Sequence, residues 1–349
     1  MPRYPSDLKR FADQIYSLRQ RAVQLEMNTL NFPLFVYSYS SRGFPDLPER
    51  FSATKDLAQI RLVSLYDVYY YLHHLDISNT LQTQPTIRFL DSGRYEVEVL
   101  GNIWQSEQQF PGPQPWSEEL YVETANNIAQ EGDVLVSYDD RSISPVDQIK
   151  KSLALFARIG VRDFKQDLLL HPNGIAPDAL AESVADLAPD IEVIGLTEKD
   201  IGFPWFIGAS YIHQLRTKLN ALTGRYIPIH IFGCFDPLTI PYLFFSGADI
   251  FDGLAWMRYY FRDGHAFYDK EFEYETSPEG LLLPDEAIRS LLAHNVEELE
   301  RLRADIRYSV LTHDLSQFER CLEHLKAFDL AAPTQQAFSH RSASFITGE

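Results

Sequence analysis

Polar residues with catalytic potential follow several apolar, β-prone runs of the sequence, at the positions where strands should end. Successive runs are followed by Asp91, Asp139, His171, Gly195 and Asp252. If the runs are parallel strands of one sheet, their carboxyl ends meet at one rim, and three carboxylates converge there. Two carboxylates in one pocket can divide the labour of glycosidic chemistry, because one stays ionised as a nucleophile while the other exchanges protons.

Asp252 lies in the stretch GADIFDG, residues 247–253. Ile250 and Phe251 are apolar and β-prone and predict a short buried strand. Asp252 comes where that strand should end, and Gly253 lets the backbone turn. This arrangement would direct the carboxylate into a pocket. Taken alone, the same pattern also fits an aspartate that caps the following turn.

Strand-like and helical segments alternate about eight times along the chain. The strand-like runs cover residues 35–37, 60–65 (where a helix is also possible), 87–90, 133–138, 168–170, 192–194, 228–232 and 250–251. Between them, helical patterns cover residues 144–156, 176–188 and 209–222. The first of these begins with Ser144 as N-cap and Pro145 at the first helical position. This alternation predicts a (β/α)8 TIM barrel, and a doubly wound open sheet is the alternative.

The barrel is expected over residues 29–330, after an N-terminal helical segment at residues 1–28. Two stretches predict insertions: residues 97–130, with a Pro-rich piece at 109–116, and the polar residues 269–285. Residues 331–349 have little to bury and predict a flexible tail.

The composition is that of a globular protein, with 349 residues, 45% hydrophobic residues and a net charge of −18. No apolar run approaches the roughly 20 residues needed to span a membrane, and the N-terminus does not resemble a signal peptide. Two cysteines make no disulfide framework, so we expect a cytoplasmic protein without a membrane partner. A charge of −18 disfavours nucleic-acid binding except through a local basic patch. Arg258 and Arg262, or the run Arg301, Arg303 and Arg307, could form one, and solvated surface charge is the alternative.

Four segments, in order, resemble motifs of the tRNA-guanine transglycosylases and their DNA-modifying relatives. DSGRYE at 91–96 is similar to DSGG(F/Y)Q or DSGSYQ, SYDD at 137–140 to FDE, and IGLTE at 194–198 to GGL-x-x-GE. The last segment has three pieces. HIFG at 230–233 resembles H-L-x-G, the stretch from Phe251 to Arg258 resembles FD-C-x-x-P-T-R, and GHAF at 264–267 resembles NGHAF. The resemblance covers roughly residues 85–310 and is nearest to the DNA 7-deazaguanine transglycosylases.

The resemblance implies roles for the two main carboxylates and for the nucleic-acid contacts. Asp252 would be the nucleophile that attacks C1′ of the target guanosine. Asp91 would be the general acid/base that serves the departing and incoming bases. Arg258 would bind a phosphate, and Arg262 would extend that basic strip.

The resemblance also implies a base-binding set: Tyr95, Asp139, His171, Gly195, Leu196, Glu198 and Gly233. Tyr95 would stack on the base, and Asp139 would accept hydrogen bonds from its amino and ring N–H groups. Gly195 and Leu196 would offer backbone groups to the base edge, with Glu198 nearby. His171 stands about where the family has a base-reading Gln.

The chain departs from the family at its zinc site. His294 resembles the last zinc ligand, but no C-x-C-x-x-C precedes it, and a tetrahedral site needs four ligands. We therefore expect no structural zinc, no zinc subdomain and no cofactor. Cys321 and His324 are read as surface or core residues. The motif Cys and Pro after the nucleophile are replaced by Gly253 and Trp256.

The leading functional prediction is an enzyme that exchanges guanine in nucleic acid for a 7-deazaguanine, with DNA favoured over tRNA. The segments LTEKDIG and GCFDPLTIPYLFFSGADIFDGLAW look more like the DNA branch. A tRNA enzyme and a non-catalytic accessory subunit remain as alternatives, and the retained Asp91 and Asp252 speak against the second. Further nucleic-acid contacts are expected from residues 97–130, a partner protein or a second copy of the chain.

Overall fold

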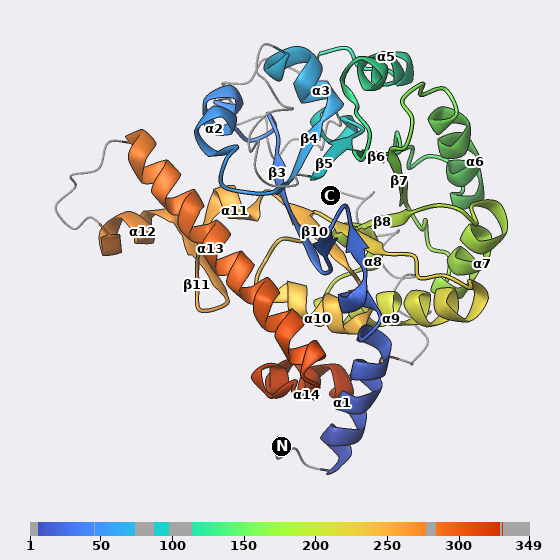
Figure 1. Ribbon diagram of the computed structural model, residues 1–349, viewed down its shortest axis with the longest axis vertical. Coiled ribbons are helices and arrows are strands. Elements are labelled where there is room, and N and C mark those ends of the chain that lie inside the picture. Colours follow the sequence, from blue (N-terminus) through green and yellow to red (C-terminus); the bar gives the residue numbers. More distant parts are fainter. Residues whose placement is uncertain are drawn as a thin grey trace, which may run out of the picture.

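Eight parallel strands close into a barrel surrounded by helices, so the predicted TIM barrel is confirmed (Figure 1). The computed structural model describes residues 6–44, 46–73, 87–97, 114–276, 284–328 and 330. The barrel strands are β3 (Leu34–Tyr39), β4 (Ile60–Ser64), β5 (Ile87–Asp91), β6 (Val134–Val136), β7 (Lys165–Leu170), β8 (Val193–Thr197), β9 (Ile229–Phe232) and β10 (Ile250–Gly253). The ring closes where β10 pairs with β3, with Asp252 opposite Val36.

The strands form where the sequence has continuous apolar runs, since a parallel strand in a covered barrel is buried on both faces. All six residues of β3 are buried, and so are all five of β4. Burial on both faces explains why residues 60–64 are a strand, although a helix was possible from the sequence.

Side chains that point into the barrel follow the two-residue period of a strand. Leu34 and Val36 from β3, Ile87 and Phe89 from β5, and Ile250 from β10 belong to the interior hydrophobic cluster. Two residues further along, the same period brings Ser38, Asp91 and Asp252 to the carboxyl end of the interior. The strand period therefore positions the candidate carboxylates.

Helices cover the outside of the barrel. Going round one side, Figure 1 shows α5 (Glu118–Ile128), α6 (Pro145–Phe156), α7 (Pro177–Leu187) and α9 (Trp205–Leu222). The helix α10 (Thr239–Ser246) leads into β10, and α2 (Leu47–Thr54) and α3 (Leu65–Asp67) flank β4. The Ser144 side chain accepts a hydrogen bond from the Asp147 amide and so caps α6 as predicted.

A long helix, α13 (Pro284–Leu311), runs across the other side of the barrel (Figure 1). It contacts β3, α2 and the hairpin formed by β11 (Tyr259–Arg262) and β12 (His265–Tyr268). At its far end, α14 (Glu319–Ala327) packs against α1 (Ser6–Arg19). None of the described helices is long and apolar enough to cross a membrane.

Several sequence-based boundaries differ from the structure. The expected insertion at 97–130 is shorter, because residues 118–128 form the barrel helix α5, which Ser117 caps and which buries Tyr121 and Ala125. The expected excursion at 269–285 contains the helix α12 (Asp269–Thr276). Residues 98–113 and 277–283 of these two insertions, and the predicted tail at 331–349, lie outside the described residues.

The N-terminal segment also differs in detail. Its helix ends at Arg19, and the short η1 (Ala22–Gln24) and a hairpin of β1 (Glu26–Met27) and β2 (Leu30–Asn31) follow.

Candidate active site

A cavity of about 470 Å³ lies at the carboxyl ends of the barrel strands. Seven of the predicted site residues line it: Asp91, Tyr95, Asp139, Glu198, Gly233, Asp252 and Arg258. Glu96 and Asp236 bring its acidic residues to six, and Arg141 and Lys199 join Arg258 as basic residues. The predicted site residues His171, Gly195, Leu196 and Arg262 do not line this cavity.

Asp252 is the third residue of β10 and is buried at the cavity wall. The Ser38 hydroxyl donates to its Oδ2 at 2.7 Å, and the Gly233 amide donates to its Oδ1 at 3.0 Å. Gly233 follows β9 with a φ of +79°, a conformation that suits glycine and turns its N–H toward β10. These two donors hold the Asp252 carboxylate in place at the cavity wall, and a carboxylate held there can act as a nucleophile.

Asp91 is the last residue of β5 and has the opposite environment. Burial raises the pKa of Asp91 to about 8, and the negative charges of Glu96, Asp139 and Asp252 add to the increase. The hydrogen bond from the Ser92 backbone acts against this shift but is outweighed. Asp91 therefore carries a proton at neutral pH and can act as a general acid.

The two carboxylates thus line one cavity but have different environments. Donors surround Asp252, whereas Asp91 is desolvated and faces other acids. Environments that separate two titratable groups in this way mark the acid and the nucleophile of a pair.

Two further acids next to Asp91 were not foreseen from the sequence. The Ser40 hydroxyl donates to Glu96 Oε1 at 2.6 Å, and the Ser41 amide donates to Asp67 Oδ2 at 3.0 Å. Burial raises the pKa of Glu96 to about 8 and that of Asp67 to about 6. Glu96 occupies the position of Gln in the family motif that DSGRYE resembles. A protonated Glu has the shape of Gln and can donate a hydrogen bond as Gln does. The Glu in place of the motif Gln was therefore the signal in the sequence that could have identified Glu96 as a site residue.

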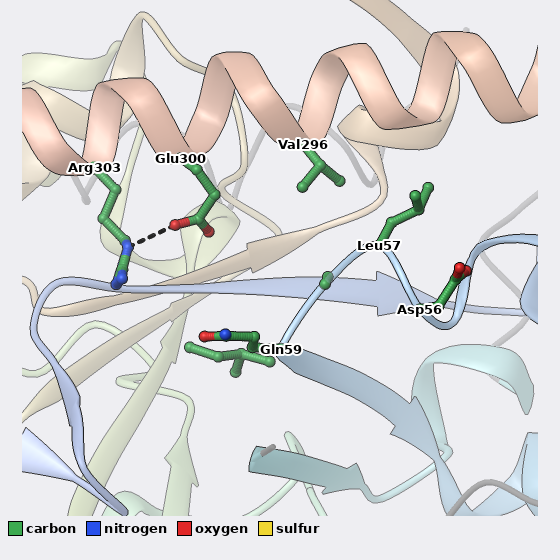
Figure 2. A pocket seen from close by; sticks show the side chains of 8 residues that line it. Asp56, Leu57, Gln59, Val296, Glu300 and Arg303 are labelled. Carbon is green, nitrogen blue, oxygen red and sulfur yellow. Dashed lines mark hydrogen bonds and ion pairs between the residues drawn. The ribbon is translucent and has the colours of Figure 1, made fainter. Parts of the chain in front are cut away.

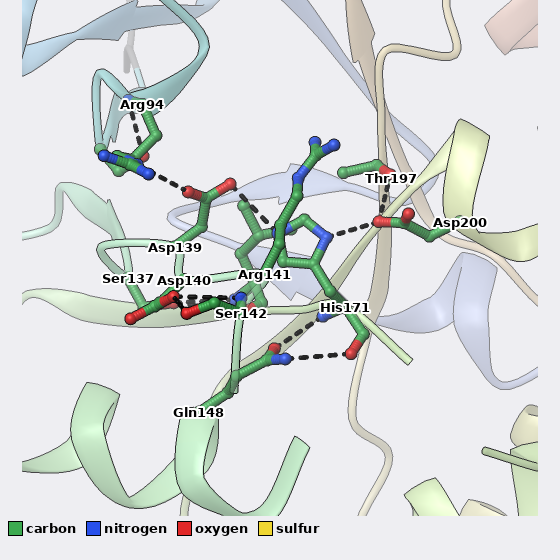
Figure 3. A network of polar contacts seen from close by, with 12 residues as sticks. Arg94, Ser137, Asp139, Asp140, Arg141, Ser142, Gln148, His171, Thr197 and Asp200 are labelled. Atoms are coloured by element: carbon green, nitrogen blue, oxygen red, sulfur yellow. Dashed lines mark hydrogen bonds and ion pairs between the residues drawn. The ribbon is translucent and has the colours of Figure 1, made fainter. Parts of the chain in front are cut away.

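Asp139 is held by a polar network behind the cavity wall (Figure 3). His171 lies between Asp139 and Asp200, with Nε2 at 3.1 Å from Asp139 Oδ2 and Nδ1 hydrogen-bonded to Asp200 Oδ2. Gln148 fixes the backbone of His171 from both sides, accepting from its N–H at 2.8 Å and donating to its carbonyl at 3.1 Å. The ring is 1% exposed.

This network changes the part expected of His171. Burial lowers its pKa, but the hydrogen bonds to Asp139 and Asp200 outweigh burial, and the pKa of His171 is raised. Because His171 lies behind Asp139 and not on the cavity wall, the expectation that it reads the base is not met in this geometry. Its contacts orient Asp139 instead.

Gly195 and Leu196 lie inside β8, whereas the sequence predicted that Gly195 would follow the strand. A Cβ on Gly195 would come within 2.5 Å of the Phe232 ring and 2.9 Å of Asp167 Oδ1, so glycine here makes room inside the barrel. Leu196 is fully buried. The cavity wall at this strand is made by the next residues, Thr197 and Glu198.

Tyr95 and Arg258 flank the mouth of the cavity. Tyr95 is exposed on the short helix α4 (Arg94–Val97), and the Arg42 guanidinium lies 4.5 Å from its ring centroid. Arg258, the last residue of α11 (Ala255–Arg258), packs 5.7 Å from the Phe44 ring centroid. Arg262 lies on the hairpin instead, 4.9 Å from the Phe267 ring centroid.

The arginines of α13 do not belong to this cavity. Arg303 lines a second hollow of about 380 Å³ beside Gln59 and Ile60, at the amino-terminal end of β4 (Figure 2). Its guanidinium pairs with Glu300 at 2.9 Å, and Glu300 also accepts from the Tyr37 hydroxyl at 3.2 Å. Acid and base neutralise each other there, so this hollow lacks the prepared carboxylates of the first.

The segment around His294, which resembles the family's zinc-binding segment, holds two elements of the fold together. His294 Nε2 contacts the Phe261 carbonyl at 2.8 Å, and the Asn295 side chain bonds the Phe261 amide and the carbonyls of Trp256 and Tyr259. These bonds fasten α13 to the hairpin.

The other candidate metal ligands also have structural surroundings. His324 bonds the Tyr242 hydroxyl at 2.8 Å, and both cysteines are buried. Within the described ranges, no three His, Cys, Asp or Glu side chains are grouped to hold a metal; the absence of zinc stays a prediction.

No family model matches this chain, and no curated protein matches its sequence.

Proposed function

We propose that this protein is a transglycosylase that exchanges a guanine base in nucleic acid for a 7-deazaguanine base, with DNA as the favoured polymer. The observation that carries the proposal is the pair of carboxylates in one cavity, with hydrogen-bond donors around Asp252 and a raised pKa at Asp91. The four motif segments in family order supply the identity of the base.

In the first half-reaction, a carboxylate oxygen of Asp252 forms a bond to C1′ of the target nucleotide. The C1′–N9 bond breaks, and its electron pair goes to the departing base, which takes the proton of Asp91. The products are a glycosyl ester on Asp252, a neutral guanine and an ionised Asp91. This is nucleophilic catalysis with general acid assistance, as in retaining glycosidases.

In the second half-reaction, Asp91 takes the N9 proton of the incoming base. N9 then attacks C1′, and the ester bond breaks, which returns the carboxylate of Asp252. Both half-reactions use the same two groups, so the proton count and the charge of the site are restored after each exchange.

The rest of the cavity suits a flipped purine. Asp139 presents carboxylate oxygens that can accept from the amino and ring N–H groups of guanine, and Tyr95 offers an aromatic face at the mouth. Arg258 lines the same cavity, and its guanidinium would bind a backbone phosphate. Binding through a few cationic side chains is compatible with a net charge of −18, because only the backbone phosphates need cations.

A tRNA substrate remains the second candidate, since the same site chemistry would serve it. The accessory-subunit alternative is disfavoured, because a binding subunit needs neither an anionic Asp252 nor a protonated Asp91.

The test is incorporation of isotope-labelled guanine or 7-deazaguanine into DNA and into tRNA by the purified protein. Nucleosides from the host, with and without the gene, are analysed in parallel by mass spectrometry. We expect label in DNA, and none with Asp252→Asn. Label in tRNA alone would favour the second candidate, and no label in either polymer, alone or with partner proteins, would overturn the proposal.

A further inference from the structure

A second buried acid–histidine pair lies inside the barrel, directly behind Asp252. His230 is in β9 and Asp167 in β7, and both side chains are fully buried. His230 Nδ1 lies 2.6 Å from Asp167 Oδ2, and His230 Nε2 lies 3.4 Å from Asp252 Oδ1. Three residues from three strands thus form a line that ends at the cavity.

Apolar groups enclose the ring of His230. Its centroid is 3.8 Å from that of Phe232 and 5.4 Å from that of Phe89. The missing side chain of Gly195 leaves room for Phe232 and for Asp167 Oδ1. Asp167 from β7 and Asp252 from β10 are the charged groups that face the ring. Any charge on the ring therefore responds to these two carboxylates.

The contact with Asp252 is looser than the contact with Asp167. His230 Nε2 and Asp167 Oδ1 are buried and have no hydrogen-bond partner among the described residues. A ring nitrogen at 3.4 Å is within reach of a hydrogen bond that tightens when substrate arrives. The short contact between His230 Nδ1 and Asp167 Oδ2 orients the ring so that His230 Nε2 faces Asp252 Oδ1.

We propose that His230 is a positioning residue for the nucleophile. Asp167 fixes the His230 ring through Nδ1, and Nε2–H holds Oδ1 of Asp252 for attack on C1′. The same N–H stabilises the negative charge that returns to Asp252 when the ester breaks. This inference rests on the proposed function, because it takes Asp252 as the nucleophile. It adds two residues, His230 and Asp167, that the motif resemblance does not assign to the chemistry.

The electrostatics agree with this geometry. Burial lowers the pKa of His230, but Asp167 and Asp252 outweigh burial and raise it to about 9. The raised pKa favours a charged ring at neutral pH, and it adds to the geometric contacts with Asp167 and Asp252. When Asp252 becomes an ester, the Asp167–His230 pair remains neutral overall. When the ester breaks, the carboxylate reforms beside a fixed cation, which lowers the barrier of that step.

The first experiment is a 15N NMR titration of histidine ring nitrogens in the full-length protein, with His230→Gln identifying the signal and His213→Gln as control. We expect His230 to carry protons on both nitrogens at pH 7.5. Asp167→Asn and Asp252→Asn should each lower its titration midpoint by at least 1 pH unit. A ring that is neutral at pH 7, or that ignores Asp252→Asn, would overturn the proposal.

The second experiment measures single-turnover formation and breakdown of the covalent protein–nucleic acid adduct. His230→Gln should slow both steps about 10- to 100-fold, the usual range for loss of a hydrogen bond to a charged group, and leave the Kd for nucleic acid within about twofold. Asp167→Asn should give a smaller loss and move the alkaline limb of adduct breakdown to lower pH, because it lowers the pH at which His230 loses its charge. Thermal unfolding of each variant controls for folding. Equal loss of binding and rate would overturn the positioning role.

The two proposals can fail separately. If no polymer supports exchange while the His230 ring is doubly protonated and responds to Asp252→Asn, the proposed function falls and the coupling of His230 to Asp252 is supported.

Discussion

The strand β10 has an aspartate near each end, and their surroundings differ. Asp249, just before the strand, is fully buried at its amino-terminal end. Its Oδ1 accepts from Arg19 at 2.6 Å and from the Tyr226 hydroxyl at 2.7 Å. Its Oδ2 accepts from Arg216 at 2.5 Å and from the Ile229 amide at 2.9 Å. Asp252, three residues later, has a serine, one amide and a histidine around it.

Residue type alone therefore does not distinguish a reactive carboxylate from a structural one. Two arginines offset the charge of Asp249, and buried donors occupy both of its oxygens, so a substrate cannot approach. In the part of the chain that the structure describes, no arginine pairs with Asp252; its oxygens contact Ser38, Gly233 and His230, and it borders a cavity. An aspartate that borders a cavity and can still accept hydrogen bonds, such as Asp252, is the candidate for chemistry. An aspartate whose oxygens are fully hydrogen-bonded in the interior, such as Asp249, is structural.

The largest effect should come from Asp252→Asn. We expect base exchange to fall at least about a thousandfold, because an amide cannot form the covalent ester. The free energy of unfolding should change by less than about 1 kcal/mol, since Asn can still accept the Ser38 or Gly233 hydrogen bond. Exchange assays and urea unfolding measure the two quantities. Exchange within tenfold of wild type would refute the nucleophile assignment.

Asp249→Asn should reverse this pattern. Removing one member of a buried ion network leaves two arginines without their counter-charge, which costs about 3–5 kcal/mol of the free energy of unfolding. Urea unfolding at pH 7 measures it. The protein that remains folded should keep an exchange rate close to wild type. A stable Asp249→Asn protein would show that the buried ion pairs add little.

Asp91→Asn should lower the exchange rate about 100- to 10,000-fold, the range for loss of a general acid. It should also change the pH dependence. Since the pKa of Asp91 is raised to about 8, the wild-type rate of the first half-reaction should fall as the pH rises through 8, and the variant should lack this limb. Single-turnover rates from pH 6 to 10 provide the test, and an unchanged alkaline limb would reassign the acid.

The same shift predicts a stability effect of definite sign. The folded state holds the Asp91 proton more tightly than the unfolded chain, so wild-type stability should decline as the pH rises from about 4, the ordinary Asp pKa, to 8. Asp91→Asn should decline less over this range. Thermal unfolding at pH 5 and 8 checks both proteins, and equal slopes would contradict the burial of this carboxyl.

The smallest effect is expected from Arg258→Gln. Loss of one phosphate contact should weaken nucleic-acid binding to a similar degree for all sequences and reduce the salt slope by about 1. Free-base binding should not change. Titrations at several salt concentrations measure the slope, with Arg301→Gln on α13 as the matched control. An identical slope for Arg258→Gln and wild type would remove Arg258 from the interface.

Local pattern in the sequence was enough to predict the eight strands, their order along the chain and the strand-end positions of Asp91 and Asp252. Apolar runs and polar residues that follow them are properties of short segments. The misplacement of Gly195 has a physical reason: glycine was read as a strand end, but Phe232 from the neighbouring strand fills the space beside it.

The residues missed by sequence reasoning depend on pairing between distant strands. Ser38 reaches Asp252 only because β3 and β10 are neighbours, and Asp167 reaches His230 across the barrel interior. Nothing within β3 or β7 alone marks either residue. Such partners become visible only when the strand register is known.

The closure of the ring between β10 and β3 has a consequence for biogenesis. Ser38 and Asp252 are 214 residues apart in sequence, and the Trp256 indole also donates to the Ser38 carbonyl across the same seam. Contacts of this separation cannot form on the ribosome until the last strand has emerged, and they contribute to slow folding. The surroundings of Asp252, the proposed nucleophile, are therefore assembled at the end of folding, and incomplete chains that already expose Asp91 and Asp139 would lack them.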